Sequence, residues 1–430
     1  MNTPSARIAE AASCLSGHDP EALPVAQAQQ IIRSMLAPID AVEKLALRAA
    51  LGRVLARDIV SSIDVPAHDN SAMDGYALHG ADLDAECAVA LKIVGTAFAG
   101  RPFNGLVGRG ECVGIMTGAI MPDTCDSVAP QELVQATGDM RLTVPAGAIQ
   151  PGANRRLRGE DLQSGSTALA RGKILRPADL GLLASLGVAE VPVYRKLRVA
   201  FFSTGDELRS IGEPLDPGCV YDSNRYTLYG MLTRLGCEVI DLGVVKDDPA
   251  TLEATLRSAC EAADAIVTSG GVSVGEADYT RQIMAQLGEV AFWKLAMRPG
   301  RPLAFGRIAS NGHSACLFGL PGNPVAVMVS FYFFAREALL QMMGAEAPPL
   351  PLLRVPTQSA IRKKAGRTEY QRGILAVDEQ GRQTVRTTGA QGSGVLRSMS
   401  EANCMVVLAH EQGEVEAGDE VDVIVFDGLI

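Results

Sequence analysis

Two adjacent glycines in a polar loop are the feature of this sequence that most clearly suggests chemistry. The β-branched run Ala265-Ile-Val-Thr268 predicts a buried strand, and Ser269-Gly270-Gly271 follows it directly. Glycine adopts positive φ and lacks Cβ, so backbone N–H groups at such a turn can close around a phosphate. Ser273 extends the loop, and Asp278 and its neighbour Glu276 add carboxylates of the kind that bind Mg²⁺. The loop therefore predicts a phosphate cradle beside magnesium.

An ordinary glycine-rich turn with solvated acids explains the same residues about as well when the loop is taken alone. The sequence matches neither G-x-x-x-x-G-K-[ST] nor G-x-G-x-x-G, so neither standard nucleotide-binding motif is present in this loop.

Acidic residues also follow the other predicted strands of this region. Ligands bind outside the carboxyl ends of parallel strands, so we expect these groups to meet at one end of the sheet. The acidic pairs are Asp206 and Glu207, Asp247 and Asp248, and Glu276 and Asp278. The last strand is followed by a polar turn, Pro321-Gly322-Asn323-Pro324, in place of acids. Acids scattered at random would not recur after strands, which favours a functional site. Lys294 and the turn Arg298-Pro-Gly-Arg301 add cations suited to an oxyanion.

Polar groups gather in the first 170 residues as well. Asp74-Gly75 places a carboxylate on a tight bend, and Thr117-Gly118 places a hydroxyl where a strand ends. Three arginines, Arg155, Arg156 and Arg158, precede Glu160-Asp161 and could pair with phosphate or carboxylate. Structural turns and solvated loops remain the alternative interpretation of each segment.

The elements that must position these residues fall into four groups. Residues 198–344 alternate strands and helices, which predicts a mostly parallel sheet with helices on both faces. Residues 89–144 carry short β-rich runs, and the chain after Ala347-Pro-Pro-Leu-Pro351 alternates as a small β-barrel does. Helical spacing predicts helices over Val25–Met35, Val42–Asp58 and Pro177–Leu186.

We therefore predict a multidomain α/β protein. A helical or mixed linking domain comprises residues 1–60 and 150–196, and a β-rich domain, residues 61–149, is inserted into it. A three-layer α/β domain covers residues 197–345 and a C-terminal β-barrel covers 346–430.

Composition limits the class of protein. The chain has 430 residues, is 47% hydrophobic and carries a net charge of −10, which disfavours nucleic acid and anionic membranes as partners. Nine cysteines without a C-x-x-C pair indicate reduced thiols in a cytoplasm. No secretory leader and no apolar run of about 18 residues is evident, so we expect an unexported, cytoplasmic protein.

Taken together, the motifs resemble one family. They are Asp69-Asn-Ser-Ala-Met-Asp-Gly-Tyr76, Thr117-Gly-Ala119, Arg158-Gly-Glu-Asp161, Ser203-Thr-Gly-Asp-Glu207, Tyr221-Asp-Ser-Asn224, Ser269-Gly-Gly-Val-Ser-Val-Gly-Glu-Ala-Asp-Tyr279 and Gly319-Leu-Pro-Gly-Asn-Pro324. In this order they are similar to the MoeA family of molybdopterin molybdenumtransferases, which includes the E domain of gephyrin. The resemblance spans nearly the whole chain.

The resemblance implies an elongated homodimer with a MogA-like third domain. Its cleft would lie between the third domain of one protomer and the second domain of the other. It also implies Mg²⁺-dependent hydrolysis of adenylated molybdopterin and insertion of molybdate at the dithiolene, which gives AMP and molybdenum cofactor. An upstream adenylyltransferase that hands over the substrate is a further candidate partner.

The family's functional positions carry over residue by residue. Catalytic roles fall on Asp74, Thr117, Asp161, Glu207, Asp247 and Asp278, of which Glu207, Asp247 and Asp278 would hold magnesium. Substrate-binding roles fall on Ser269, Gly270, Gly271, Ser273, Pro321, Gly322 and Asn323, with Lys294, Arg298, Arg372 and Ser393 as candidates for the molybdate oxyanion.

This sequence departs from the family pattern at a few positions. His68 replaces an aromatic residue, and Arg298 and Arg301 stand where lysines are common, which makes the oxyanion assignment weaker than that of the acids. The alternatives are the adenylyltransferase that acts one step earlier, which shares the α/β domain, and a non-catalytic scaffold like gephyrin. The complete set of domains argues against the first, and retention of all six polar positions argues against the second.

Overall fold

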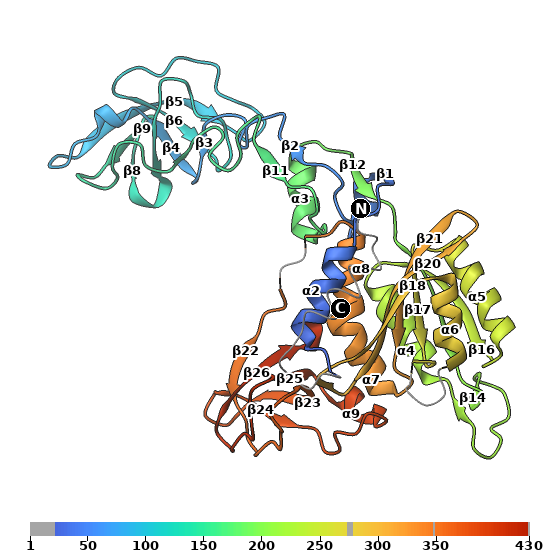
Figure 1. Cartoon of the computed structure of the whole chain (residues 1–430). Coiled ribbons are helices and arrows are strands. Elements are labelled where there is room, and N and C mark those ends of the chain that lie inside the picture. The colour runs from blue at the N-terminus through green and yellow to red at the C-terminus, as the bar shows by residue number, and fades with distance from the viewer. Residues whose placement is uncertain (1–21, 273–277, 347–348, 429–430) are drawn as a thin grey trace.

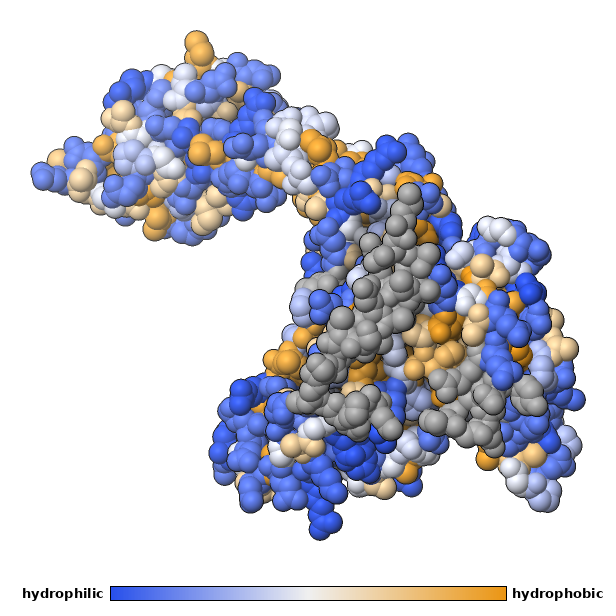
Figure 2. All heavy atoms as spheres, in the orientation of Figure 1, coloured by the Kyte–Doolittle hydropathy of each residue, from blue (hydrophilic) through white to orange (hydrophobic). Residues whose placement is uncertain are grey.

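The protein has two separate bodies joined by a narrow neck (Figure 1, Figure 2). A computed structural model describes residues 22–272, 278–346 and 349–428. The mixed, multidomain α/β class predicted from the sequence is confirmed.

The neck and its base are built from segments far apart in the chain. Strand β2 (Ile59–Val60) leads out to the distal body and β11 (Thr167–Leu169) returns antiparallel to it. At the base, β1 (Val42–Ala46) pairs with β12 (Glu190–Tyr194). Helices α2 (Val25–Met35) and α3 (Pro177–Ser185) confirm two of the three helices predicted here.

The helix predicted over Val42–Asp58 is wrong. The segment forms β1, a short 3₁₀ turn (Leu47–Ala50) and extended chain, and Gly52 takes φ +74°. Its apolar spacing fits a helix, but β12 arrives from about 150 residues later in the chain and supplies a pairing partner. Long-range strand pairing thus overrides the local pattern, and Gly52 in the left-handed region cannot continue a helix.

The distal body is a six-stranded sheet in the order β7-β4-β6-β5-β9-β8. Separate apolar clusters around Val113 and Leu91 pack within it. Its strands are β4 (Gly75–Leu78), β5 (Val89–Ala97), β6 (Glu111–Ile115), β7 (Ser127–Pro130), β8 (Gln135–Gly138) and β9 (Arg141–Val144), with β3 (Asn70–Ser71) paired to β10 (Arg155–Arg156) and 3₁₀ turns at Gly80–Asp82 and Gln131–Leu133.

The central α/β domain has three layers. Its sheet has the order β16-β13-β17-β21-β20-β18, in which the first four strands are parallel and the last two antiparallel. They are β13 (Arg198–Thr204), β16 (Glu238–Val245), β17 (Ala265–Ser269), β18 (Gly288–Lys294), β20 (Pro302–Ser310) and β21 (His313–Leu320). Side chains alternate between faces, so Ile266 packs with α5 (Pro249–Ala262) and α6 (Asp278–Leu287), whereas Val267 packs with α4 (Ser223–Arg234) and α7 (Pro324–Ser330).

A long helix follows β21: α7 continues through a π-helical stretch (Phe331–Ala335) into α8 (Arg336–Met342). Among the described residues, only Pro324–Met342 is long and apolar enough to cross a membrane by length and composition. Because 78% of its window is buried inside the protein, it is the core helix of this domain.

The C-terminal domain is a small barrel. Its sheet has the order β19-β23-β25-β26-β22 with β24 on β23, and a bridge from Thr357 to Val385 joins the two ends. The elements are β19 (Met297–Arg298), β22 (Leu353–Pro356), β23 (Thr368–Val377), β24 (Gln383–Thr387), α9 (Leu396–Glu401), β25 (Cys404–Leu408), β26 (Glu420–Val425) and a 3₁₀ turn at Phe426–Gly428. Since β19 comes from the α/β domain, the two domains share a sheet.

Candidate functional site

The loops after the four parallel strands surround a cavity of about 380 Å³. Its lining includes Glu207, Asp247, Asp248, Ser269, Gly270, Gly271, Gly322 and Asn323. Of the acid clusters predicted to meet at the carboxyl ends of the strands, Glu207 therefore meets Asp247 and Asp248 there, whereas Asp206 is not part of the lining and Glu276 lies outside the described residues. Pro321 is buried beside this lining, Ser273 lies outside the described residues, and the helix that begins at Asp278 places that residue's backbone but its carboxylate is not described.

The Gly-Gly turn needs both glycines. Gly270 has φ +94° and Gly271 has φ +68°, and a Cβ on Gly270 would lie 2.4 Å from the carbonyl oxygen of Thr204. Left-handed backbone and close approach to β13 both exclude a side chain. The turn thus brings main-chain groups, rather than side chains, to the cavity wall.

The two acids after β16 have different surroundings. Asp248 is the N-cap of α5 and accepts hydrogen bonds from the Thr251 N–H (2.9 Å) and hydroxyl (2.7 Å), and the hydroxyl bond lowers its pKa. Asp247 accepts a hydrogen bond from the Thr204 hydroxyl. Asp248 therefore starts a helix, whereas Asp247 is held by one neutral donor and keeps carboxylate lone pairs for a ligand.

The donor set of this cavity suits a hard cation. Glu207 and Asp247 contribute carboxylates, and a buried oxygen of Asp222, Oδ2, has no hydrogen-bond partner. Among the described side chains, no three acids, histidines or cysteines converge into a ready-made metal cage. Magnesium usually binds through one or two carboxylates plus substrate phosphates and water, so this incomplete set fits it.

Asn224 was not singled out as a functional residue from the sequence. Its side-chain amide is buried and donates to Ser269 Oγ (2.8 Å) and to the Gly322 carbonyl (2.6 Å), while its own Oδ1 has no partner. It therefore ties the loop after β17 to the loop after β21 and still offers an acceptor in the cavity lining. One sequence signal could have identified Asn224. It is the second residue of α4, two positions after the aspartate, Asp222, that caps this helix.

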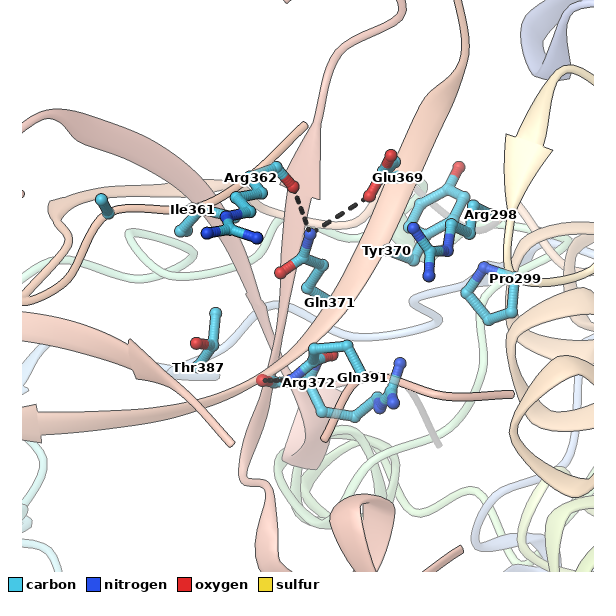
Figure 3. A pocket seen from close by; sticks show the side chains of 11 residues that line it. Arg298, Pro299, Ile361, Arg362, Glu369, Tyr370, Gln371, Arg372, Thr387 and Gln391 are labelled. Atoms are coloured by element: carbon cyan, nitrogen blue, oxygen red, sulfur yellow. Dashed lines mark hydrogen bonds between the residues drawn. The ribbon is translucent and has the colours of Figure 1, made fainter. Parts of the chain in front are cut away.

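A second cavity, of about 240 Å³, lies between the barrel and the Arg298-Pro299 turn. Figure 3 shows Arg298, Arg362 and Arg372 around it. Arg372 is fully buried and donates only to neutral groups: Ser398 Oγ (3.0 Å) and the carbonyls of Ala390 (3.3 Å) and Gly392 (3.0 Å). Burial and the nearby Arg298 lower the pKa of Arg372 to about 10. Arg372 has no carboxylate partner among the described residues, and burying an unpaired charge costs free energy. An anionic ligand in this cavity would offset that cost.

The two cavities are linked through the segment 391–393. Gln391 accepts from the Arg372 N–H (2.9 Å), and the Ser393 carbonyl accepts from the Val325 N–H (2.9 Å) at the start of α7. Arg298 and Arg372 line the same cavity, whereas Ser393 follows Gly392, whose carbonyl accepts from Arg372, but does not itself line the cavity. Lys294 lies at the end of β18, where its carbonyl accepts from Leu23, and it lines neither cavity.

The distal body carries the remaining predicted residues. Asp74 Oδ1 accepts from the N–H and the hydroxyl of Thr117, both at 2.7 Å, and the backbone bond lowers the pKa of Asp74. Asp161 donates its N–H to Val65 near the neck and is exposed. Figure 1 places this body away from the α/β domain, so one protomer does not bring these three residues to the acid cavity.

Comparison with known proteins covers most of the chain. Three family models match it: the MoeA N-terminal region (domain I and II) at residues 23–187, a probable molybdopterin binding domain at 200–341 and the MoeA C-terminal region (domain IV) at 354–426. A molybdopterin molybdenumtransferase of Haemophilus influenzae is 42% identical over 90% of this chain and 95% of its own length, and one of Nostoc sp. is 36% identical over 88% and 87%. A crystal structure of the molybdopterin biosynthesis moeA protein of Pyrococcus horikoshii OT3 superposes with a TM-score of 0.79 at 28% identity, covering 94% of this chain and all of that one.

Proposed function

The chain belongs to the MoeA family and is a molybdopterin molybdenumtransferase, and from this premise we propose that it inserts molybdate into adenylated molybdopterin and releases AMP. The observation that carries the proposal is the presence of two different cavities, which are connected by the hydrogen bond from the Val325 N–H, beside the acid cavity, to the Ser393 carbonyl, beside the arginine cavity. One is acidic with a main-chain cradle, and the other holds a buried guanidinium with neutral partners. The reaction needs both a place for a phosphoanhydride and a place for an oxyanion.

The acid cavity would receive the phosphates and the pterin. Main-chain N–H groups of Gly270 and Gly271 can approach phosphate oxygens without side-chain interference. Ser269 accepts a hydrogen bond from Asn224, so its own proton is available to a phosphate oxygen. Glu207, Asp247 and Asp278 would hold Mg²⁺, which when bound offsets charge on the phosphates.

The arginine cavity would receive molybdate. The hydrogen bonds of Arg372 engage Nε and Nη2, and these bonds fix its guanidinium plane toward the cavity where Arg298 and Arg362 add charge. A tetrahedral dianion there would satisfy the buried charge. The reaction balances when water adds across the phosphoanhydride to give AMP and the molybdopterin phosphate. Two Mo–S bonds then form as one molybdate oxygen leaves as water with the two thiol protons of the dithiolene.

A homodimer would complete the site, with the distal body of the partner facing the acid cavity. Both half-sites have exposed apolar rims: Met73 and Met116 flank Asp74 and Thr117, and Val220 and Tyr221 line the acid cavity. Apolar surface around two separated polar half-sites is typical of faces that meet. Asp74, Thr117 and Asp161 would then position substrate across the cleft.

The test is AMP release from purified protein supplied with adenylated molybdopterin, Mg²⁺ and molybdate, with each component omitted in turn. We expect release only when all are present, and we expect Asp278→Ala to abolish it while size-exclusion chromatography with light scattering still finds a dimer. Formation of adenylated molybdopterin from molybdopterin and ATP would replace this proposal with the earlier adenylyltransferase step. AMP release without molybdate would show hydrolysis that is not coupled to molybdate insertion, and would overturn the proposed transfer. Tight substrate binding without turnover would indicate a scaffold.

A further inference from the structure

A third cavity, of about 780 Å³, lies at the junction of the linking region, the α/β domain and the linker to the barrel. It is formed by the turn at Leu51–Val54, the segment before α3, the end of α4, one face of α8 and Pro349–Pro351. It shares no residue with the acid cavity or the arginine cavity. Its size is within the range of about 300–1,000 Å³ found for small-molecule sites.

The charge of this cavity is opposite to that of the whole chain. Among the described residues, six cations and one carboxylate, Glu346, line it, although the net charge of the protein is −10. Some of these cations are neutralised nearby: Arg53 pairs with Glu43, and Lys173 with Asp179 at 3.1 Å. Arg176 also pairs with Asp179, at 3.8 Å. Arg336 and Lys196 are the two cations of this wall that matter for an anionic ligand.

Arg336 is the residue that sets the chemistry. It is the first residue of α8, its Nε is buried without a hydrogen-bond partner, and no described carboxylate forms an ion pair with it. Burial lowers its pKa. The residue as a whole is half-buried, and a guanidinium held partly out of water is normally paired or hydrogen-bonded because desolvation is expensive. The buried Nε of Arg336 therefore leaves a place for an anion. Exposed Lys196 adds a second cation on the rim.

The rest of the wall is apolar. Val54, Leu340, Met343 and Leu350 lie alongside the cations. An inorganic anion would pair with Arg336 but leave the apolar wall in contact with water. A neutral hydrocarbon would cover the apolar wall but leave Arg336 without an anion. We propose that this cavity binds an amphipathic anion, one carboxylate or phosphate head on an apolar body, with the head on Arg336 and the body along α8.

The test uses isothermal titration calorimetry of the full-length protein with two probes. Octanoate has a carboxylate head on an aliphatic body, and 1-naphthyl phosphate has a phosphate head on an aromatic body. Octanol and 1-naphthol serve as their uncharged counterparts. We expect at least one anion to bind at one site per chain and its uncharged counterpart to bind at least tenfold more weakly. The probe that binds tells whether an aliphatic carboxylate or an aromatic phosphate fits better.

Variants tie the binding to this cavity. Arg336→Met should weaken it about tenfold or more, since hydrogen bonds to a charged group are lost, and Arg336→Lys should retain part of it. Lys196→Met should weaken it less. Arg354→Met, which removes an exposed arginine paired with Glu420 on the barrel, should change nothing. Without probe, Arg336→Met should melt no lower than the parent, because an unpaired, half-buried charge is removed.

Several results would overturn the proposal. These are no binding of either anion, equal binding of the uncharged counterparts, unchanged affinity in Arg336→Met, or loss of binding in Asp247→Asn, which would assign the probe to the acid cavity. None of them depends on molybdenum transfer, so failure here and failure of the proposed activity can be told apart.

Discussion

Arg372 shows how a single buried side chain can define a ligand. It is among the largest fully buried side chains of the described protein, and all its hydrogen-bond partners are neutral. A sequence can nominate an arginine for an oxyanion, but only the fold shows that this one is desolvated. Its burial is the reason to prefer it over the exposed Arg298 as the main anchor for molybdate.

The lowered pKa of Arg372 predicts a pH dependence. Burial and Arg298 lower it to about 10, so the guanidinium is charged at pH 7 and loses its proton as the pH rises through about 10. Molybdate affinity should therefore be level up to about pH 9 and then fall by about tenfold per pH unit above 10. Equilibrium dialysis with molybdate across this range measures it.

Arg298→Gln is the matched variant for this prediction. It removes the neighbouring charge that helps to lower the pKa, so the midpoint of the loss should move to higher pH even if overall affinity falls. A midpoint that stays in place, or moves down, would mean that Arg372 is not the titrating anchor.

Asn224 gives a second prediction at the residue scale. Asn224→Ala leaves Ser269 and the Gly322 carbonyl without their buried donor, at a cost of about 1–3 kcal/mol. We expect KM for adenylated molybdopterin to rise about tenfold while the molybdate requirement is unchanged, because the arginine cavity is separate. Steady-state AMP release measures both.

Asn104→Ala, at an exposed position of the distal body, is the control for that variant and should behave as the parent. If Asn224→Ala raised the requirements for both substrates equally, Asn224 would support the general fold and not the substrate loops.

At the scale of elements, the Gly-Gly turn makes a testable contrast with another glycine. Gly270→Ala forces φ +94° on a residue with Cβ and places it 2.4 Å from the Thr204 carbonyl, which should cost at least about 1–3 kcal/mol and abolish AMP release. Denaturant unfolding followed by tryptophan fluorescence measures the first effect, since Trp293 lies in the same sheet.

Gly230→Ala provides the opposite case. Gly230 is inside α4 with no atom within 4 Å of an added Cβ, so alanine should stabilise the helix by about 0.5–1 kcal/mol and leave activity intact. Equal losses in both variants would remove the argument that position, rather than residue type, makes Gly270 necessary.

Sequence patterns predicted most elements of the α/β domain because its strands are buried on both faces. A run such as Ala265–Thr268 is apolar throughout, and β17 is buried at every residue. The same reasoning failed at Val42–Asp58, where a strand partner comes from far along the chain. It also missed Asn224, because its importance comes from two loops that only the folded sheet brings together.

At the scale of the whole molecule, the separation of the two half-sites predicts complementation between variants. Asp74→Asn and Asp247→Asn should each be inactive, because each lacks one half of every site. If sites form between protomers, activity should return when the two variants are mixed, unfolded and refolded together. Half of the dimers are then mixed and each mixed dimer has one intact site of two, so we expect about a quarter of the parental activity.

Refolding either variant alone is the control, and native mass spectrometry with a mass-tagged variant counts the mixed dimers. A mixture that contains mixed dimers but releases no AMP would show that each site lies within one chain. The sequence places Asp74 and Asp247 in different domains, but it cannot say which protomers share a site, because that depends on how the neck orients the distal body.

The neck has a consequence for how genes of this kind change. The chain leaves for the distal body along β2 and returns along β11, and these strands are hydrogen-bonded neighbours. The body between them has its own apolar clusters around Val113 and Leu91. An in-frame recombination within residues 61–166 can therefore remove or exchange that body as a cassette and leave the remaining reading frame with its own intact fold. The polar cluster at Asp74 and Thr117 can thus be inherited, replaced or lost as a unit.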